Sequence, residues 1–361
     1  MDRRSFLRTS ALGGAAAATT TALAAPAYAQ GKRTLTLVTT WGRGLAGVHD
    51  SAQRCADSIT AMTDGQLTVE LKAAGELVGA FEVFDAVTSG QADMYHGADY
   101  YFVGQHPGYA FFTAVPFGMT AQELVNWYYQ DGGHELHDEL GQIFGLKSFL
   151  AGNTGAQAGG WYSREINSPE DFKGLKFRMP GLGGKALGKL GASVQNLPGG
   201  EVYQALASGA IDGTEWIGPW ADEKAGFQEI TKIYYTAGFH EPGAGLSLAT
   251  NRDVYDSLSP AHQKVIEIAA GEAHQWNLAQ FLANNGAALQ RLQASGVKLM
   301  EFPDSVWDAF GAASMEVHAE NMGDELYKKI HDSAMASMKS SSAWLEKSSG
   351  AYTKQRDRVL G

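Results

Sequence analysis

The chain has 361 residues, with 28 lysines and arginines against 39 aspartates and glutamates, a formal net charge of −11. Nucleic acid is a poor partner for such an acidic chain, because phosphate is bound by clustered basic side chains. The single cysteine, Cys55, excludes an internal disulfide, and the length is enough for two domains with sizeable cores.

Residues 1–29 have the features of an export signal. Arg3 and Arg4 are followed by Ser-Phe-Leu and a short run rich in alanine, and Ala27-Tyr-Ala29 resembles a signal-peptidase site. We therefore expect twin-arginine export, a mature chain from about Gln30 and a periplasmic location. Removing three arginines and one aspartate with this segment leaves 25 basic and 38 acidic side chains, a net charge of −13. A membrane anchor is the alternative, but the apolar run is short.

An α/β pattern begins directly after this segment. Residues 33–41 alternate β-branched and apolar side chains, which predicts a strand that runs into a Gly-rich turn. A helix over about 48–63 and a second strand over 66–73 are expected next.

One motif occurs twice, at residues 82–93 and 201–212. Glutamate, valine, an aromatic residue, alanine, Ser-Gly and aspartate coincide between the two copies. Each copy predicts an amphipathic helix ended by Ser-Gly and followed at once by a short buried strand, 94–97 or 213–216. The repeat indicates two similar α/β lobes, although a chance match is the alternative because Ser-Gly helix ends are common.

The second lobe is expected to contain a strand over 174–180, a helix over 184–190 and a strand over 193–197. Ligands of open α/β sheets bind outside the carboxyl ends of the strands. This rule places five side chains around one crevice: Trp41, Tyr100, Arg178, Glu215 and Trp216. After Pro260 the pattern is helical apart from a short strand over 297–302.

Several polar side chains are candidates for ligand binding. Arg178 lies where a strand enters a Gly-rich turn, which suits capture of a carboxylate, although a surface arginine fits the spacing equally well. Asn153 and Gln157 offer amides between the lobes, where they could also simply cap turns.

Two acids stand in apolar surroundings. Glu215 lies among tryptophans, isoleucine and proline, and Glu241 follows in Gly-Phe-His-Glu-Pro-Gly. A buried carboxylate is costly unless it is paired, so two of them indicate a shared positive partner. Protonation of Glu215, or its pairing with Lys185 or another base, is the alternative.

Catalytic motifs are missing from the sequence. It has no Gly-x-Ser-x-Gly elbow, and Gly181-Leu-Gly-Gly-Lys185 lacks the spacing of a phosphate-binding loop. His134-Glu-Leu-His137 is not a zinc motif, and we interpret it as a solvated helix face. The remaining metal-binding chemistry is that of oxygen ligands, which favours a hard cation.

Three stretches together resemble the solute-binding proteins of TRAP transporters, over essentially the whole chain after the export signal. They are GNTGAQAGGW, the run FRMPGLGGKALGKLGASVQNLPGGEVYQALASGAIDGTEWIGPW, and GFHEPG. The resemblance is closest to the subgroup that binds 2-oxo and 2-hydroxy monocarboxylates such as pyruvate and lactate. It implies an α/β fold, a two-lobed periplasmic binding protein clamshell with a long bridging helix and C-terminal helices.

The resemblance also implies roles for individual residues. Arg178 would pair with the ligand carboxylate, and a metal ion, Na⁺ or Ca²⁺, would bridge protein and ligand. The implied metal ligands are Gln157, Glu215, the backbone carbonyl of Trp216, and Glu241. The implied substrate-binding residues are Arg178, Gln157, Asn153, Tyr100, Trp41 and Trp216. The run FHEPGAG departs from the more aromatic sequence that the family leads us to expect around the second acid.

We expect residues 30–152 with 244–275 to form lobe I, and residues 153–243 with 296–330 to form lobe II. A helix over 262–295 should span both lobes. Residues 331–361 are expected to be a C-terminal helical tail, and members of this family can dimerise by exchanging a C-terminal helix.

The predicted function is delivery of a small 2-oxo or 2-hydroxy monocarboxylate, with a metal ion, to TRAP transporter membrane subunits, without enzymatic activity. One alternative is a dicarboxylate or sugar-acid ligand, which needs a second basic residue such as Arg43 or Lys185. The other is a periplasmic enzyme acting on a small acid, which needs a nucleophile beside a base.

Overall fold

The computed structural model describes residues 31–361, of which residues 34–361 form one compact unit. The export signal predicted for residues 1–29 lies outside the described residues. Helices and strands alternate through two mixed sheets, so the α/β class and the two-lobed architecture are confirmed. Within residues 31–361, none of the helices combines the length and apolar character needed to cross a membrane.

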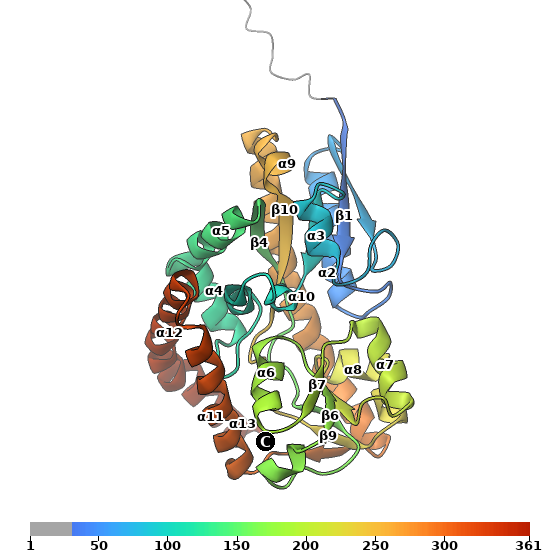
Figure 1. The fold of residues 1–361 in the computed structure, drawn as a ribbon, viewed down its shortest axis with the longest axis vertical. Coiled ribbons are helices and arrows are strands. Elements are labelled where there is room, and N and C mark those ends of the chain that lie inside the picture. Colours follow the sequence, from blue (N-terminus) through green and yellow to red (C-terminus); the bar gives the residue numbers. More distant parts are fainter. Residues whose placement is uncertain (1–30) are drawn as a thin grey trace, which may run out of the picture. The chain divides into compact units, whose positions relative to one another are not determined.

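The first sheet forms the centre of lobe I (Figure 1). β1 and β3 are parallel, whereas β10 runs antiparallel to both of its neighbours. From edge to edge the strands are β2 (Leu67–Lys72), β1 (Arg33–Thr39), β3 (Met94–Gly97), β10 (Gly245–Asn251) and β4 (Leu146–Asn153). The helices of this lobe include α2 (Val48–Met62), α3 (Val83–Thr88), α4 (Ala121–Gln130), α5 (Gly133–Ile143) and α9 (Arg252–Asp256).

The second sheet forms the centre of lobe II. Its strand order is β11 (Lys298–Met300), β9 (Ile233–Tyr235), β5 (Gly160–Tyr162), β8 (Gly213–Thr214), β6 (Lys176–Arg178) and β7 (Ser193–Gln195). β6 is parallel to both β7 and β8, while β5 runs antiparallel to β8 and β9. The helices of this lobe include α6 (Gly181–Lys189), α7 (Gly199–Ala207) and α8 (Pro219–Ala225).

The repeated motif folds in the same way in both lobes. α3 and α7 each end at a serine, and the next glycines, Gly90 and Gly209, have φ angles of 79° and 71°. A side chain would strain this left-handed conformation, which explains the Ser-Gly pair. Each helix leads into a short strand. The strand after α3 is β3, which is parallel to β1, and the strand after α7 is β8, which is parallel to β6.

The final aspartate of each repeat fastens these strands to each other. Asp93 Oδ2 accepts a hydrogen bond from Thr36 N at 2.7 Å, and Asp212 Oδ2 accepts one from Lys176 N at 2.9 Å. In both lobes the aspartate N–H also donates to the carbonyl of the same partner residue. The aspartates coincide in the repeat because each closes the same strand-to-strand junction.

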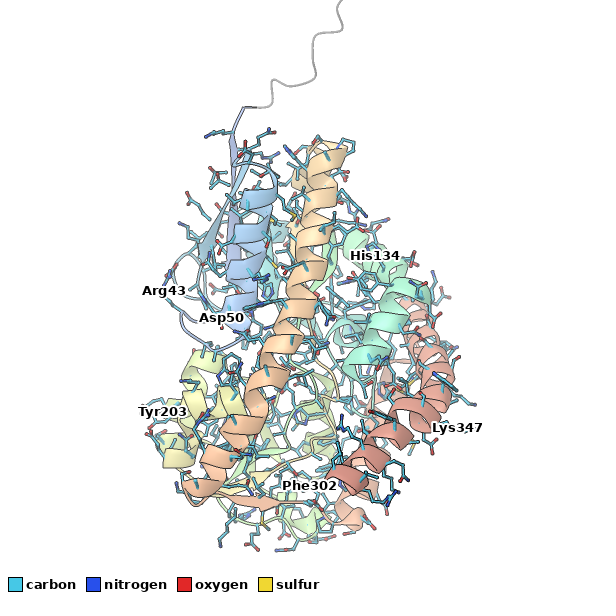
Figure 2. All side chains as sticks on the ribbon, turned by 180° about the vertical axis from the view of Figure 1, so that it is seen from behind. Arg43, Asp50, His134, Tyr203, Phe302 and Lys347 are labelled. Carbon is cyan, nitrogen blue, oxygen red and sulfur yellow. The ribbon has the colours of Figure 1, made fainter. Side chains whose placement is uncertain are left out.

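Three segments connect the two sheets. Residues 154–159 lead from β4 to β5, residues 236–244 lead from β9 to β10, and α10 (Pro260–Ala294) is the long helix. Figure 2 shows α10 running past the helices of both lobes, and it packs on α2 and β4 in lobe I and on α8 in lobe II. Asn277 Nδ2 donates to Gly47 O at 2.9 Å, and Asn285 Oδ1 accepts from Trp220 N at 3.1 Å. Polar contacts therefore fix α10 to each lobe.

The C-terminal helices pack on different lobes. α11 (Asp304–Asn321) contacts α6 of lobe II, whereas α12 (Glu325–Leu345) contacts α4 and α5 of lobe I (Figure 1). A π-helical turn over Glu346–Gly350 and α13 (Ala351–Leu360) continue from α12, and neither contains a buried residue.

The interpretation of His134–His137 as a solvated helix face is wrong. His137 is fully buried, its Nε2 lies 3.0 Å from Asp99 Oδ2, and its ring stacks on Phe112 with the centroids 3.9 Å apart. Ser247 Oγ donates to the same Asp99 oxygen at 2.6 Å. Glu135 and Glu139 are exposed and Asp138 is half-buried, because α5 turns only one face toward β4 and that face carries His137.

Candidate ligand and cation site

The site is built where the chain passes between the sheets. The segments around Gln157 and Glu241 run side by side, joined by a backbone hydrogen bond from Gln157 N to Glu241 O at 2.9 Å. Gly238 N donates to Gln157 O at 3.2 Å, and Ala158 N donates to Ile217 O at 2.9 Å. The loop after β8 and both crossover segments are therefore tied together.

Arg178 ends β6, and its side chain is buried. Its Nε donates to Leu197 O at 3.1 Å, and its Nη1 donates to Oε1 of Glu215. The guanidinium carbon lies 5.4 Å from the centre of the Trp216 ring, close enough for a cation–π contact. Burial by itself lowers the pKa of Arg178, but Glu215 and two nearby tyrosines outweigh this and raise it.

Glu215 directly follows β8 and is fully buried. One carboxylate oxygen, Oε1, accepts a hydrogen bond from Arg178, whereas Oε2 has no hydrogen-bond partner among the residues that the structure describes. The predicted strand over 213–216 ends two residues early, at Thr214, because the chain turns at Glu215 into the site. Glu215 therefore does pair with a base, as the alternative interpretation stated. The base is Arg178 and not Lys185, which is exposed.

Gln157 and Glu241 bring further oxygen atoms to the same place. Gln157 Nε2 donates to Thr154 Oγ1 at 3.0 Å, and in residues 31–361 its amide oxygen has no hydrogen-bond partner. Glu241 Oε2 is also buried and has no partner within the same described residues. Burial raises the pKa of Glu241 well above its usual range and Glu215 raises it further, against opposing contributions from Arg178 and a hydrogen bond with Tyr100.

Aromatic side chains enclose a small cavity beside these groups. Trp41, Tyr100 and Trp216 line it together with Gln157 and Glu241. The cavity measures about 10 Å³, which is about the space that one water molecule needs. A larger ligand can therefore enter only if the surrounding side chains or the lobes move apart.

Two of these aromatic rings have specific supports. Trp41 Nε1 donates to His96 Nδ1 at 2.9 Å, and burial lowers the pKa of His96 to about 4, so its ring is neutral and can accept. The Trp216 ring lies against Gly199, where any side chain would collide with it. Position 199 therefore requires glycine for Trp216 to keep its place.

Asp222 holds the loop that follows Glu215. Its Oδ1 accepts hydrogen bonds from the backbone N–H groups of Ile217 and Gly218, each at 3.0 Å. Its Oδ2 accepts from Trp161 Nε1 at 2.9 Å and from Tyr234 Oη at 3.0 Å. This buried carboxylate fastens the loop that carries Glu215 and Trp216 to the second sheet.

The structure brings most of the predicted site residues together. Trp41, Tyr100, Gln157, Trp216 and Glu241 line the cavity, and Arg178 joins them through its ion pair with Glu215. Asn153 is buried next to cavity-lining Thr154, and its Oδ1 accepts from Gly155 N at 2.8 Å. Its Nδ2 has no hydrogen-bond partner.

Sequence reasoning missed three residues of the site. Thr154 orients the Gln157 amide, Tyr101 Oη accepts from Arg178 Nη2 at 3.4 Å, and His240 places Nε2 at 3.4 Å from Glu215 Oε2. Each of them is within three residues of a predicted site residue. Their nearness in the sequence to predicted site residues is the feature that could have identified them.

Within the described part of the chain, three buried oxygen atoms of these residues have no hydrogen-bond partner: Gln157 Oε1, Glu215 Oε2 and Glu241 Oε2. Buried polar atoms are rarely left unsatisfied, and carboxylate and amide oxygens are the ligands of hard cations. One ligand atom each of Glu215, His240 and Glu241 lie within 4.8 Å of one another. The residues present therefore fit a bound cation.

The chain is similar to known solute-binding proteins over most of its length. The family model described as bacterial extracellular solute-binding protein, family 7, matches residues 43–325. The monocarboxylate 2-oxoacid-binding periplasmic protein of Nostoc sp. (strain PCC 7120) is 40% identical over 309 residues, 85% of each chain.

Two crystal structures are similar in fold and in sequence. A TRAP transporter solute-binding protein from Bordetella bronchiseptica RB50, a mixed-occupancy dimer with copurified calcium and picolinate, has a TM-score of 0.89 and 32% identity, over 91% of this chain and 98% of that one. A TRAP periplasmic solute-binding protein from Pseudoalteromonas atlantica T6c, with bound sodium and pyruvate, has a TM-score of 0.87 and 39% identity. The match covers 90% of this chain and 99% of that one.

Proposed function

The chain belongs to family 7 of the bacterial extracellular solute-binding proteins, the solute-binding proteins of TRAP transporters, and from this premise we propose its ligand. It binds a small 2-oxo or 2-hydroxy monocarboxylate, such as pyruvate or lactate, together with Na⁺ or Ca²⁺. The observation that carries the proposal is the set of unpartnered oxygens on Gln157, Glu215 and Glu241, next to buried Arg178.

Charge balance supports a bridging cation. Two buried acids and one guanidinium share the site, so both acids can be ionised beside an entering carboxylate only if a further positive charge offsets them. A cation held by Gln157, Glu215, Glu241 and the Trp216 carbonyl would offset this charge and polarise the 2-oxo or 2-hydroxy oxygen. Arg178 would take the ligand carboxylate, and Trp41, Tyr100 and Asn153 would complete the pocket.

The surroundings of the cavity favour a monocarboxylate over a dicarboxylate or sugar acid. A second acidic group needs a second basic partner, for which Arg43 and Lys185 were the candidates. Arg43 pairs with Glu76 at the surface, and Lys185 is exposed on α6. Neither lines the cavity.

We expect stabilisation by the acid to require the cation. A ligand at about 100 times its Kd adds roughly 2.7 kcal/mol to the free energy of unfolding. Pyruvate or lactate should raise the midpoint of thermal unfolding in the presence of Ca²⁺ or Na⁺. The rise should be much smaller when EDTA is added and Na⁺ is replaced by a large organic cation. Propionate, which lacks the 2-oxygen, should stabilise weakly under both conditions.

Two results would contradict the proposal. A pyruvate shift that survives removal of both cations would exclude the bridge. A larger shift with succinate or glucuronate than with pyruvate or lactate would favour the dicarboxylate or sugar-acid alternative.

We also propose a periplasmic location reached by twin-arginine export, with transfer of the ligand to TRAP membrane subunits. The support is the sequence of residues 1–29 and the membership of a family whose proteins work with membrane components. The same membership supports a transport role without catalysis.

We propose that the C-terminal tail mediates a homodimer. The side chains of Tyr352, Val359 and Leu360 are 67%, 66% and 79% exposed, which leaves apolar surface on this tail that a partner subunit could cover. Light scattering of the full chain should give a dimer, and a chain ending at Leu345 should be monomeric. The shortened chain loses no buried residue, so its unfolding midpoint should change little. A monomeric full chain at micromolar concentration would contradict the proposal.

A further inference from the structure

His240 is a buried histidine that the proposed function leaves without a role. It is 2% exposed, and among residues 31–361 neither ring nitrogen has a hydrogen-bond partner. Its Nε2 lies 3.4 Å from Glu215 Oε2, and it precedes Glu241 in the second crossover segment. A buried imidazole with two unsatisfied nitrogens is costly, so the position requires a physical reason.

The surroundings hold this imidazole close to the acids. Phe239, its neighbour in the chain, stacks on Phe310 of α11 with centroids 4.0 Å apart and planes 13° apart. Gly238 and Gly183 pack against His240, because added Cβ atoms would lie 2.6 Å from its Cε1 and 2.7 Å from its Cβ. With glycine on two sides and a stacked neighbour, the ring has little freedom to turn away from Glu215.

The three side chains form a mixed nitrogen and oxygen donor set. One ligand atom each from Glu215, His240 and Glu241 lie within 4.8 Å of one another. Ca²⁺ and Mg²⁺ take oxygen ligands, whereas imidazole suits Zn²⁺, Fe²⁺ and Ni²⁺, and Mn²⁺ accepts carboxylates and is the weakest binder of this transition series. The imidazole therefore bears on which cation the site prefers.

We propose that His240 contributes an imidazole nitrogen to the cation site, so that the site binds a divalent transition ion in preference to Ca²⁺. The inference rests on the proposed function, because it concerns the cation of that site. It goes beyond the Na⁺ and Ca²⁺ of the proposal by adding a nitrogen ligand and another class of metal.

The test uses Mn²⁺ as the probe. The full mature chain is stripped of metal and given one equivalent of Mn²⁺ with excess pyruvate. Electron spin-echo modulation then reports directly whether an imidazole ¹⁴N is bonded to the bound ion. A parallel titration in which Ca²⁺ displaces Mn²⁺, followed by the signal of free Mn²⁺, gives the ratio of the two affinities.

His240→Gln is the informative variant, because the amide can place an oxygen near the position of Nε2 and turn the donor set into an all-oxygen one. We expect wild type to show nitrogen modulation and His240→Gln to lose it. The affinity ratio of Mn²⁺ to Ca²⁺ should fall about tenfold or more in the variant, since even groups that only orient a metal ligand alter metal affinity by about 10–100-fold. Its Ca²⁺ affinity should change less than its Mn²⁺ affinity.

His331→Gln is the matched control. His318 and His331, on α11 and α12, have ring centroids 5.3 Å apart, so this second pair of imidazoles could bind stray metal. This variant should keep both the modulation and the affinity ratio. Modulation that disappears in His331→Gln but persists in His240→Gln would overturn the inference.

The outcomes also separate this inference from the proposed function. If wild type binds pyruvate with Ca²⁺ and Mn²⁺ but shows no nitrogen modulation, His240 is not a ligand and the proposed function stands. If pyruvate fails to bind with any cation, the proposed function fails and the inference fails with it. His240→Phe, which keeps an aromatic ring, is the substitute if the Gln variant does not fold, and it should also lose the modulation.

Discussion

Replacing Arg178 with methionine should lower the affinity for pyruvate by about thirtyfold or more. Removing one partner of a buried, hydrogen-bonded charge pair typically costs 2–5 kcal/mol, and the guanidinium is the proposed partner of the ligand carboxylate. Arg178→Lys keeps the charge but loses the planar fork, so it should fall between wild type and the methionine variant. Isothermal titration with pyruvate in saturating Ca²⁺ measures all three proteins.

The same substitution should also destabilise the fold. The resemblance implied a role for Arg178 in binding the ligand carboxylate and gave no role for it in stability. The structure changes that expectation, because Arg178 pairs with fully buried Glu215. An uncompensated buried charge costs about 3–5 kcal/mol, so urea unfolding of Arg178→Met should show a loss of that order.

A double variant separates binding from stability. Arg178→Met combined with Glu215→Gln removes both charges, so much of the lost unfolding free energy should return while pyruvate binding stays weak. Arg43→Met, which breaks an exposed pair with Glu76, is the matched control and should alter neither quantity by more than about 1 kcal/mol. Near-normal pyruvate affinity in Arg178→Met would show that the carboxylate is held elsewhere.

The sequence predicted the architecture well because local chemistry determines much of it. The Ser-Gly pairs after residues 88 and 207 end helices in both copies of the repeat, and the long helix has the expected bounds within two residues. Strand ends on one edge of a sheet converge. The residue types near those ends were therefore enough to predict that Trp41, Tyr100 and Trp216 lie around one cavity.

The missed features depend on which side chains face each other, and local pattern does not determine this. Arg178 and Glu215 are 37 residues apart, and their contact follows from the pairing of β6 with β8 and from their rotamers. His137 looked solvated because its neighbours are acidic, but its own face of α5 packs on lobe I. The proximity of His240 to Glu215 depends on how the second crossover segment lies against the loop after β8, which local pattern does not determine.

Replacing Glu215 with glutamine should have opposite effects with and without the cation. In Ca²⁺ the variant loses a proposed metal ligand and one negative charge, so the affinities for Ca²⁺ and for pyruvate should each fall more than tenfold, about 1.4 kcal/mol. Without the cation, the wild-type carboxylate repels the ligand carboxylate, and the neutral amide does not. Pyruvate should therefore bind metal-free Glu215→Gln at least as well as metal-free wild type.

This reversal of sign distinguishes a bridging cation from a carboxylate that only holds Arg178 in place. If Glu215 acted solely through Arg178, the variant would bind pyruvate more weakly under both conditions. Selectivity provides a second readout: with Ca²⁺, wild type should prefer pyruvate to propionate because the 2-oxo oxygen reaches the ion, and Glu215→Gln should lose most of that preference. Glu76→Gln, an exposed acid paired with Arg43, is the control and should behave as wild type throughout. Isothermal titration of each protein with both acids, in Ca²⁺ and after metal removal, tests the argument, and an equal loss of affinity in the two conditions would reject the bridge.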